Sequence, residues 1–533
     1  MFDWGVCLKL FLSAAACALA AFAPAVSAQA YATKADAAKV PATAAKTWPV
    51  EAFAELPAMD SPELSPDGAR VAARIAIKGV QQLVIAEVKG GNVRTMGLGE
   101  NDLNWWRWVN NDWLIVGIGA ETNVQGDTWS ISRVASIKAD GTKASILAKA
   151  VAAQNGDDVI WVARDGSPRI LLSYQTSIYY DDLGFWPQVS EVDVSTGKMR
   201  TVVPSRQYVR SWYADATGAV RMGVGYNDTA RSSKLLYRPD GRGSFRVVDK
   251  ANRRRHESLI VPMLFTADPG KAIASDDRDG TDAFYELDLG TLELGKKLYE
   301  APGFDLGGLE VDAAGTDMAV GDRRARIIST SQDLKKLIVH VGAASQPGAY
   351  YYYDTDYGAM SLLSKVSETL GVRPQLSPVK TIRYKARDGL EIAAVLTLPY
   401  GKEAKDLPLI LMPHGGPFAR DAETWDWWVQ FLANRGYAVI QPNYRGSSGY
   451  GTEFAAKGEG QWGLAMQDDL NDAVDWAVKQ GIADAKRVCV VGASYGGYAA
   501  MRAAQRDGGK YRCAVSYAGV SDLGAMMRYD RAS

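Results

Sequence analysis

A serine stands between two glycines in Gly492-Ala493-Ser494-Tyr495-Gly496, which is the Gly-x-Ser-x-Gly spacing of a nucleophile elbow. The short β-branched run at 488–491 predicts a buried strand, and the alanine-rich stretch from Tyr498 onward predicts a helix. A hydroxyl that stands clear of the backbone at such a sharp turn needs strained dihedral angles, and the flanking positions pass too close for a Cβ atom. The pattern predicts Ser494 as a nucleophile, with a glycine-rich structural turn as the alternative.

A serine nucleophile also needs donors for the oxyanion, a base, and a group that orients the base. Tyr495 follows the serine at the expected helix start, so its backbone N–H is the first expected oxyanion donor. The segment Pro413-His414-Gly415-Gly416-Pro417 follows an apolar strand and its paired glycines allow close approach, so the Gly416 N–H is the second. We interpret His414 as structural, because in hydrolases with this elbow the base follows the serine in chain order.

The elements that must position these residues begin after about residue 371. A hairpin is expected around Asp388-Gly389, and strands then alternate with helix-length segments, which is typical of a mostly parallel α/β sheet. The expected strands are 409–412, 438–441 and 513–517, and the expected helices are 421–435 and 464–480.

The preceding region, from about residue 48 to 370, consists of short alternating runs broken by turn dipeptides such as Asp140-Gly141 and Asp240-Gly241. Repeated antiparallel units of this kind predict a β-propeller, and roughly 320 residues at about 40–45 per blade give about seven blades. A pair of β-sandwiches is the competing interpretation. The aromatic cluster 105–108 is interpreted as blade packing rather than as a ligand cage.

Three segments together resemble the prolyl oligopeptidase family of serine peptidases: 414–417, 443–451 (Asn-Tyr-Arg-Gly-Ser-Ser-Gly-Tyr-Gly) and 492–498. The resemblance implies an N-terminal seven-bladed β-propeller followed by a C-terminal α/β-hydrolase domain. The first two segments are most similar to the acylaminoacyl-peptidase-like branch. A segment of the Asp-Trp-x-Tyr-Glu-Glu type, with which dipeptidyl peptidases grip an amino terminus, has no match, and this counts against dipeptide release.

The resemblance implies hydrolysis of short peptides through an acyl-enzyme on Ser494, by an aminopeptidase, acylaminoacyl-peptidase or oligopeptidase-like enzyme. The alternatives are an esterase of the same fold and a catalytically dead propeller–hydrolase interaction protein. Peptide substrates are the expected partners, no metal or organic cofactor is implied, and homo-oligomerisation is left open. Sixty basic against sixty-one acidic residues give a net charge of −1, which does not favour nucleic acid or an anionic membrane surface.

The family's triad acid and base follow the serine, whereas all three histidines, His256, His340 and His414, precede Ser494 here. Asp522 and Asp530 come too early for the triad acid and are interpreted as flanking a helix. We therefore expect the triad Asp and His beyond residue 533 of a longer peptidase, with a pseudoenzyme as the alternative. The 533-residue polypeptide itself is expected to show at best residual hydrolysis.

The first 28 residues resemble a signal peptide, with Lys9 before an apolar run and cleavage near Ala28, and 29–47 is expected to be a flexible leader. This predicts a periplasmic or secreted protein without stable membrane insertion. A lipid anchor at Cys17 is disfavoured, because Ala14 replaces the expected large aliphatic residue. Cys489 and Cys513 remain after cleavage, and we expect them to be buried free thiols rather than a disulfide.

Overall fold

The computed structural model describes residues 46–532, except for 98–100, 125, 256, 258, 267, 269, 279, 302–317, 321–322 and 373–375. The expected signal peptide, its cleavage site and Cys17 therefore lie outside the described residues, as does His256. Among the helices that are described, none has the length and apolar character needed to cross a membrane.

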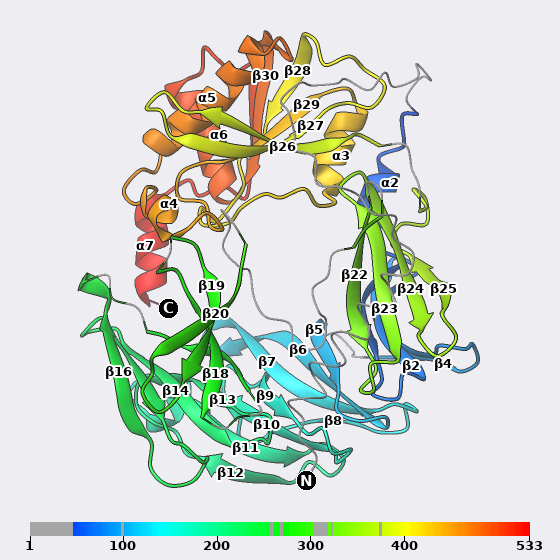
Figure 1. Ribbon diagram of the computed structural model, residues 1–533, viewed down its shortest axis with the longest axis vertical. Helices are drawn as coiled ribbons and strands as arrows, with labels where there is room; N and C mark the ends of the chain where they lie inside the picture. The colour runs from blue at the N-terminus through cyan, green and yellow to red at the C-terminus, as the bar shows by residue number, and fades with distance from the viewer. Residues whose placement is uncertain are drawn as a thin grey trace. The chain divides into compact units, whose positions relative to one another are not determined.

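From Met59 to Lys365 the described residues form six antiparallel sheets in which consecutive strands are neighbours (Figure 1). The first three sheets contain β1 Met59–Leu64, β2 Arg70–Ile77, β3 Val80–Glu87 and β4 Val93–Met96; β5 Asp102–Trp108, β6 Trp113–Val124, β7 Asp127–Lys138 and β8 Ala144–Ile146; and β9 Asp158–Val162, β10 Arg169–Tyr174, β11 Gln188–Asp193 and β12 Met199–Val203. The last three contain β13 Val209–Ala214, β14 Val220–Asn227, β15 Ser232–Tyr237 and β16 Arg246–Asn252; β17 Pro262–Phe265, β18 Lys271–Asp276, β19 Ala283–Asp288 and β20 Leu294–Glu300; and β21 Met318–Val320, β22 Arg323–Thr330, β23 Lys336–Ala343, β24 Gln346–Asp354 and β25 Ala359–Lys365. Two short 3-10 helices, η1 Leu183–Phe185 and η2 Arg253–Arg255, lie between strands.

Buried side chains of successive sheets pack face to face. Leu83 and Ile85 of the first sheet share an apolar cluster with Leu114 and Val116 of the second, and similar clusters join the second to the third, the third to the fourth, and the fourth to the fifth. Another cluster joins the first sheet to the last. This arrangement is the expected β-propeller.

The described residues contain six blade-like sheets, where the chain length predicted seven blades. The first strands begin at 59, 102, 158, 209, 262 and 318, so each unit takes roughly fifty residues rather than the 40–45 that the estimate used. Long strands such as β6 and β7, of 12 residues each, contribute to this length. Within the second sheet Trp106 and Trp108 are buried among apolar neighbours, as the packing interpretation of 105–108 expected.

The C-terminal part is a six-stranded sheet in the order β26-β27-β29-β28-β30-β31. Its first three strands pair antiparallel, and β29, β28, β30 and β31 pair parallel, as the alternation of strands and helices predicted. The strands are β26 Val379–Lys385, β27 Glu391–Thr397, β28 Leu407–Leu411, β29 Ala438–Asn443, β30 Ala483–Ala493 and β31 Cys513–Tyr517.

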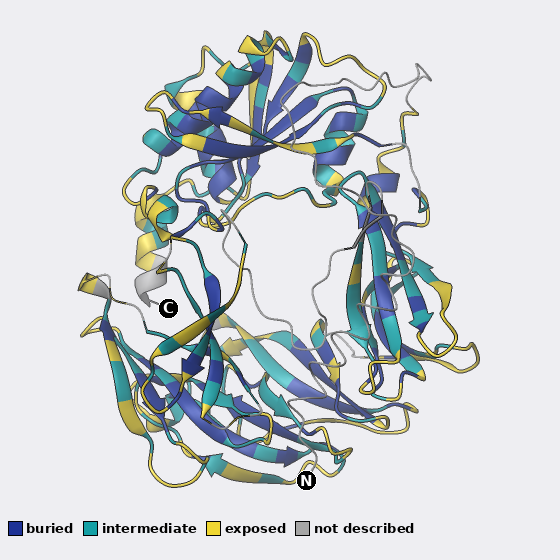
Figure 2. Cartoon of the chain, in the orientation of Figure 1, coloured by how far each residue is buried: buried dark blue, intermediate teal, exposed yellow. Residues whose placement is uncertain are grey.

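Helices cover both faces of this sheet, because alternate residues of one strand pack against different helices. Leu409 and Leu411 belong to the cluster with α5 and α6, whereas Ile410 belongs to the cluster with α3. The sheet interior is accordingly buried (Figure 2). The α-helices in the described part of the whole chain are α2 Glu51–Ala54, α3 Trp427–Asn434, α4 Thr452–Ala456, α5 Ala465–Lys479, α6 Tyr495–Arg506 and α7 Leu523–Ala532.

The two predicted helices differ in how closely they match. The helix expected at 464–480 is α5, within one residue at each end, whereas the helix expected from residue 421 begins only at Trp427. Asp426 explains the later start, because its carboxylate accepts the N–H groups of Trp428 and Val429 and so caps α3.

The prediction that Cys489 and Cys513 are buried free thiols is wrong, because the two residues form a disulfide. They lie directly opposite each other on the parallel strands β30 and β31, with Cα atoms 4.7 Å apart, inside the usual span of a disulfide. Every residue of β31, including Cys513, is exposed. The apolar runs around the cysteines predicted strands but could not show that these strands are neighbours. The fold therefore does use a cross-link in addition to its core.

Candidate active site

Ser494 stands at the turn between β30, which ends at Ala493, and α6, which begins at Tyr495. Its φ of 56° and ψ of −121° are values that a residue with a side chain rarely adopts. The strand, the strained serine and the helix follow one another as the pattern predicted, although α6 begins three residues before Tyr498.

The glycines of the elbow are required by close backbone contacts. A Cβ atom on Gly492 would lie 2.3 Å from the carbonyl oxygen of Gly496, and a Cβ atom on Gly496 would lie 2.1 Å from that of Pro413. Both separations are far below van der Waals contact, so no larger residue fits either position without backbone movement. The second contact also shows that the 413–417 loop passes directly over the elbow.

The 413–417 loop lies against the serine side chain. A Cβ atom on Gly415 would be 3.4 Å from the Cβ atom of Ser494 and 3.9 Å from its Oγ atom. Gly416 has a φ of 113° and precedes a cis peptide bond to Pro417. The structure therefore brings the two predicted oxyanion segments together, while the role of the Gly416 N–H itself stays a prediction.

The Tyr495 N–H is available at the start of α6. The first intrahelical bond of α6 is the one that the Tyr498 N–H donates to the Ser494 carbonyl at 3.0 Å. The N–H groups before Tyr498, including that of Tyr495, therefore have no acceptor within the helix. The Tyr495 ring is buried beside Trp462, Tyr498 and Tyr444, which fixes the start of the helix.

His414 is held within its loop by both ring nitrogens. Nδ1 lies 2.8 Å from the Gly415 carbonyl oxygen and Nε2 lies 2.9 Å from the Ser447 Oγ atom. The ring stacks on Tyr444 with centroids 4.4 Å apart, and burial lowers the pKa of His414 to about 4. A neutral imidazole whose two nitrogens are both engaged fits the structural role that the sequence indicated.

The 443–451 segment is held by a buried ion pair between Arg445 and Asp469. The Arg445 guanidinium donates from Nε and Nη2 to the two carboxylate oxygens of Asp469 at 2.8 and 2.7 Å, and the Arg445 N–H donates to the same carboxylate at 2.9 Å. The side chain of Asp469 is 0% exposed, whereas Asp388, the second partner of Arg445, is 50% exposed. Arg445 is therefore structural.

Asp421 was not anticipated from the sequence. Its backbone exchanges hydrogen bonds with the Asn443 side chain at 2.7 and 2.9 Å, but its Oδ2 atom is buried without a hydrogen-bond partner in the described part of the chain. Burial, followed by the nearby Asp426 carboxylate, raises the pKa of Asp421 to about 7. No residue pattern marks this position, because the burial results from the 413–421 and 443–451 segments packing together.

Neither described histidine has the surroundings of a catalytic base. His340 lies in the propeller strand β23, with Nε2 3.0 Å from the Pro347 carbonyl oxygen. Asp522 accepts the Ala525 N–H at 2.8 Å at the start of α7, as expected for a residue that flanks a helix.

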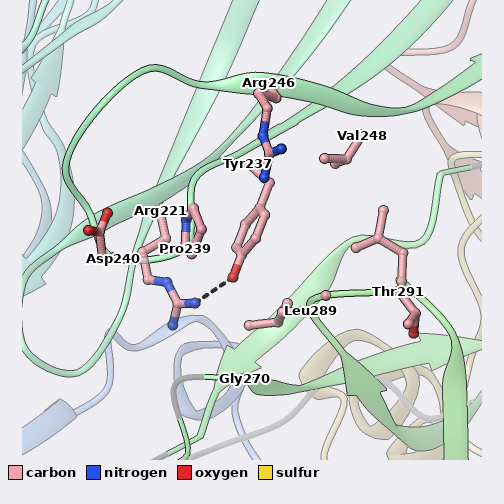
Figure 3. Close-up of a pocket in the computed structure, with 11 residues that line it drawn as sticks. Arg221, Tyr237, Pro239, Asp240, Arg246, Val248, Gly270, Leu289 and Thr291 are labelled. Atoms are coloured by element: carbon pink, nitrogen blue, oxygen red, sulfur yellow. Dashed lines mark hydrogen bonds between the residues drawn. The ribbon is translucent and has the colours of Figure 1, made fainter.

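A pocket of about 640 Å³ lies between two propeller sheets (Figure 3). Its lining residues include Arg221, Tyr237, Arg246 and Thr291, and none belongs to the 413–417 or 492–498 segments. The buried Arg221 donates to the Tyr237 hydroxyl at 2.6 Å and lies 3.8 Å from Asp215, so its charge is already engaged within the blade. We therefore locate the candidate active site at the elbow.

Known proteins resemble the chain in two ways. Over residues 423–532 it matches the profile of the prolyl oligopeptidase family. In fold, it is similar to a puromycin-hydrolysing peptidase of Mycobacterium tuberculosis (TM-score 0.62, 19% identity, covering 90% of this chain and 81% of the other) and to a puromycin hydrolase (TM-score 0.62, 17% identity, covering 90% and 80%).

Curated relatives match the C-terminal part. The dipeptidyl aminopeptidase BIII of Pseudoxanthomonas mexicana is 38% identical over 216 residues, which are 39% of this chain and 31% of the relative. The human acylamino-acid-releasing enzyme is 30% identical over 140 residues, 26% of this chain and 19% of the relative. The chain thus spans less than a third of the length of these two relatives. The residues that match the family profile include Ser494.

Proposed function

We propose that the protein is a serine peptidase in which Ser494 forms an acyl-enzyme with short peptide substrates. The observation that carries the proposal is the strained Ser494 at the strand-to-helix turn, with the glycine loop at 415–416 packed against its side chain. In the proposed reaction the Ser494 hydroxyl oxygen attacks the scissile carbonyl carbon, and the Tyr495 and Gly416 N–H groups donate hydrogen bonds to the oxyanion that forms. The hydroxyl proton passes through the expected triad histidine to the amine, which leaves as the peptide bond breaks.

The relatives support this class of substrate. By their names, these relatives include a dipeptidyl aminopeptidase and an acylamino-acid-releasing enzyme. The comparison therefore does not determine which group is released from the end of the substrate. We propose short peptides in general, because a propeller precedes the hydrolase domain in this family's fold and restricts access.

A fluorophosphonate probe tests the nucleophile. Labelling is measured on a protein that includes the expected downstream triad base, because a fluorophosphonate reacts with a serine that this base activates and no histidine follows Ser494 within the 533 residues. We expect one labelled site, which the Ser494→Ala variant loses. Ser516→Ala is the matched control, since Ser516 lies opposite Gly492 on the neighbouring strand and should leave labelling intact. Persistent labelling of Ser494→Ala would reject the assignment, and faster turnover of esters than of matched peptides would indicate an esterase.

We also propose that the protein is exported and cleaved near Ala28. The support is the sequence of the first 28 residues alone. Amino-terminal sequencing of the mature protein should begin at or close to Gln29, and a mature protein that retains Met1 would contradict cleavage.

A further inference from the structure

Three oxygen atoms of different chemistry surround the His414 ring. The Gly415 carbonyl oxygen lies 2.8 Å from Nδ1, the Tyr444 hydroxyl oxygen lies 3.2 Å from Nδ1, and the Ser447 hydroxyl oxygen lies 2.9 Å from Nε2. The protonation of the ring follows from what each oxygen is able to donate.

The contacts of Nδ1 require a hydrogen on that nitrogen. A carbonyl oxygen carries no hydrogen, so the 2.8 Å contact with Gly415 is favourable only if Nδ1 is the donor. The Tyr444 hydroxyl donates its hydrogen to the His414 carbonyl at 2.8 Å, so its oxygen presents a lone pair to Nδ1. A bare Nδ1 would face two acceptors.

The contact of Nε2 is compatible with a bare nitrogen. Burial lowers the pKa of His414 to about 4, so the ring carries a single ring N–H at neutral pH. With that hydrogen on Nδ1, Nε2 accepts from the Ser447 hydroxyl. The Tyr444 carbonyl competes for this hydrogen, since it lies 2.6 Å from the Ser447 hydroxyl oxygen and a carbonyl can accept it in addition to the Ser447 backbone N–H at 3.0 Å. The proposed tautomer requires the hydroxyl to donate to Nε2 instead. In this arrangement each ring nitrogen has a partner of the opposite role, and the Tyr444 carbonyl keeps the Ser447 backbone N–H.

The bond from Nδ1 has a geometric consequence for the predicted oxyanion donor. The Gly415 carbonyl and the Gly416 N–H are the two ends of one planar peptide unit, and in a trans peptide they point in opposite directions. Two consecutive glycines leave this plane little restrained by side chains. A hydrogen bond that fixes the carbonyl end therefore also fixes the direction of the N–H end.

We propose that His414 is a positioning residue that orients the Gly416 N–H: its Nδ1–H, kept in that tautomer by the Ser447 hydroxyl, holds the Gly415–Gly416 peptide plane. The catalytic consequence rests on the proposed function, whereas the tautomer does not. His414 contacts neither substrate nor reacting atoms in this role, and acts only through the loop.

Ring nitrogen NMR tests the tautomer without any assay of activity. The chain has three histidines, so selective ¹⁵N-histidine labelling of the unmodified protein gives three pairs of ring signals. Tyr444→Phe assigns His414, because it changes only the ring that stacks on Tyr444. We expect a protonated Nδ1 and an unprotonated Nε2 at neutral pH, and Ser447→Ala should convert this into a mixture of tautomers. A protonated Nε2 in the unmodified protein would overturn the proposal.

Two substitutions separate positioning from a merely structural role. The side-chain amide of His414→Asn occupies the place of Nδ1 and can still donate to the Gly415 carbonyl, whereas the amide of His414→Gln reaches the place of Nε2. We expect His414→Asn to keep most of the fluorophosphonate labelling rate, and His414→Gln to lose on the order of 10²-fold, as when one oxyanion donor is removed. Equal losses in two variants of matched melting temperature would refute positioning. Absence of labelling in the unmodified protein would instead refute the proposed function, and the NMR result would still decide the tautomer.

Discussion

Replacing Gly496 by alanine tests the contact between the elbow and the 413–417 loop. The added Cβ atom would lie 2.1 Å from the Pro413 carbonyl oxygen, 3.1 Å from the Pro413 carbonyl carbon and 3.2 Å from the His414 carbonyl oxygen. All three are main-chain atoms, so no side-chain rotation relieves the overlap. The loop and the elbow must separate instead.

The size of the effect follows from that separation. Real Cβ atoms stay at least 3.0 Å from such neighbours, so the loop must move by roughly 1 Å. Overpacking costs about 1–3 kcal/mol, and a main-chain clash belongs at the upper end, which corresponds to a fall in melting temperature of about 6–12 °C for a domain of this size. Because the same movement carries Gly415 and Gly416 away from Ser494, labelling should fall on the order of 10²-fold.

Thermal denaturation followed by circular dichroism, together with the fluorophosphonate labelling rate, measures both effects. Gly509→Ala is the matched control, because a Cβ atom at Gly509 meets nothing within 4 Å. This variant should match the unmodified protein in both measurements. A Gly496→Ala variant that also matches it would refute the contact, and an equal loss in Gly509→Ala would show that the loss is not caused by the overlap with Pro413.

Three further predictions concern the frame of the site. Thiol titration of the denatured, unreduced protein should find Cys489 and Cys513 unreactive, and replacing both by serine should lower the free energy of unfolding by about 3 kcal/mol, given their separation of 24 residues. Asp421→Asn should stabilise the protein relative to the unmodified chain, increasingly as the pH rises from about 4 to above 7. The reason is that the pKa of Asp421 is raised in the native state, so the unmodified protein loses stability as the pH rises through this window. A variant with an unchanged pH dependence of stability would contradict the burial of this carboxyl. Asp469→Asn should lower the free energy of unfolding by about 3–5 kcal/mol in a denaturant titration, because it leaves the charge of the largely buried Arg445 side chain without its partner. Asp388→Asn should lower it by less than about 1 kcal/mol, because Asp388 is exposed. Equal losses would contradict this ranking.

The sequence predicted those features that a few consecutive residues determine. The glycines around Ser494 indicated both the elbow and the close approach of the chain, and the alternation of runs after residue 371 indicated a mostly parallel sheet. It failed where the outcome depends on which distant segments become neighbours. The pairing of Cys489 with Cys513 requires β30 to lie beside β31. The burial of the Asp421 carboxyl requires the 443–451 segment to pack against the segment that contains Asp421.

The two motifs at 413–417 and 443–451 act as one structural unit rather than as two. Asp469 on α5 holds Arg445 through three hydrogen bonds. Two residues close to Arg445 in the chain contact His414: the Tyr444 hydroxyl donates to its carbonyl, and the Ser447 hydroxyl lies against its ring. A helix that packs under the sheet is thereby connected to the peptide plane beside Ser494 by polar contacts with little freedom to rotate. Under the proposed function, in which the Gly416 N–H is an oxyanion donor, this connection sets the direction of that N–H before the reaction, even though the loop contains two consecutive glycines.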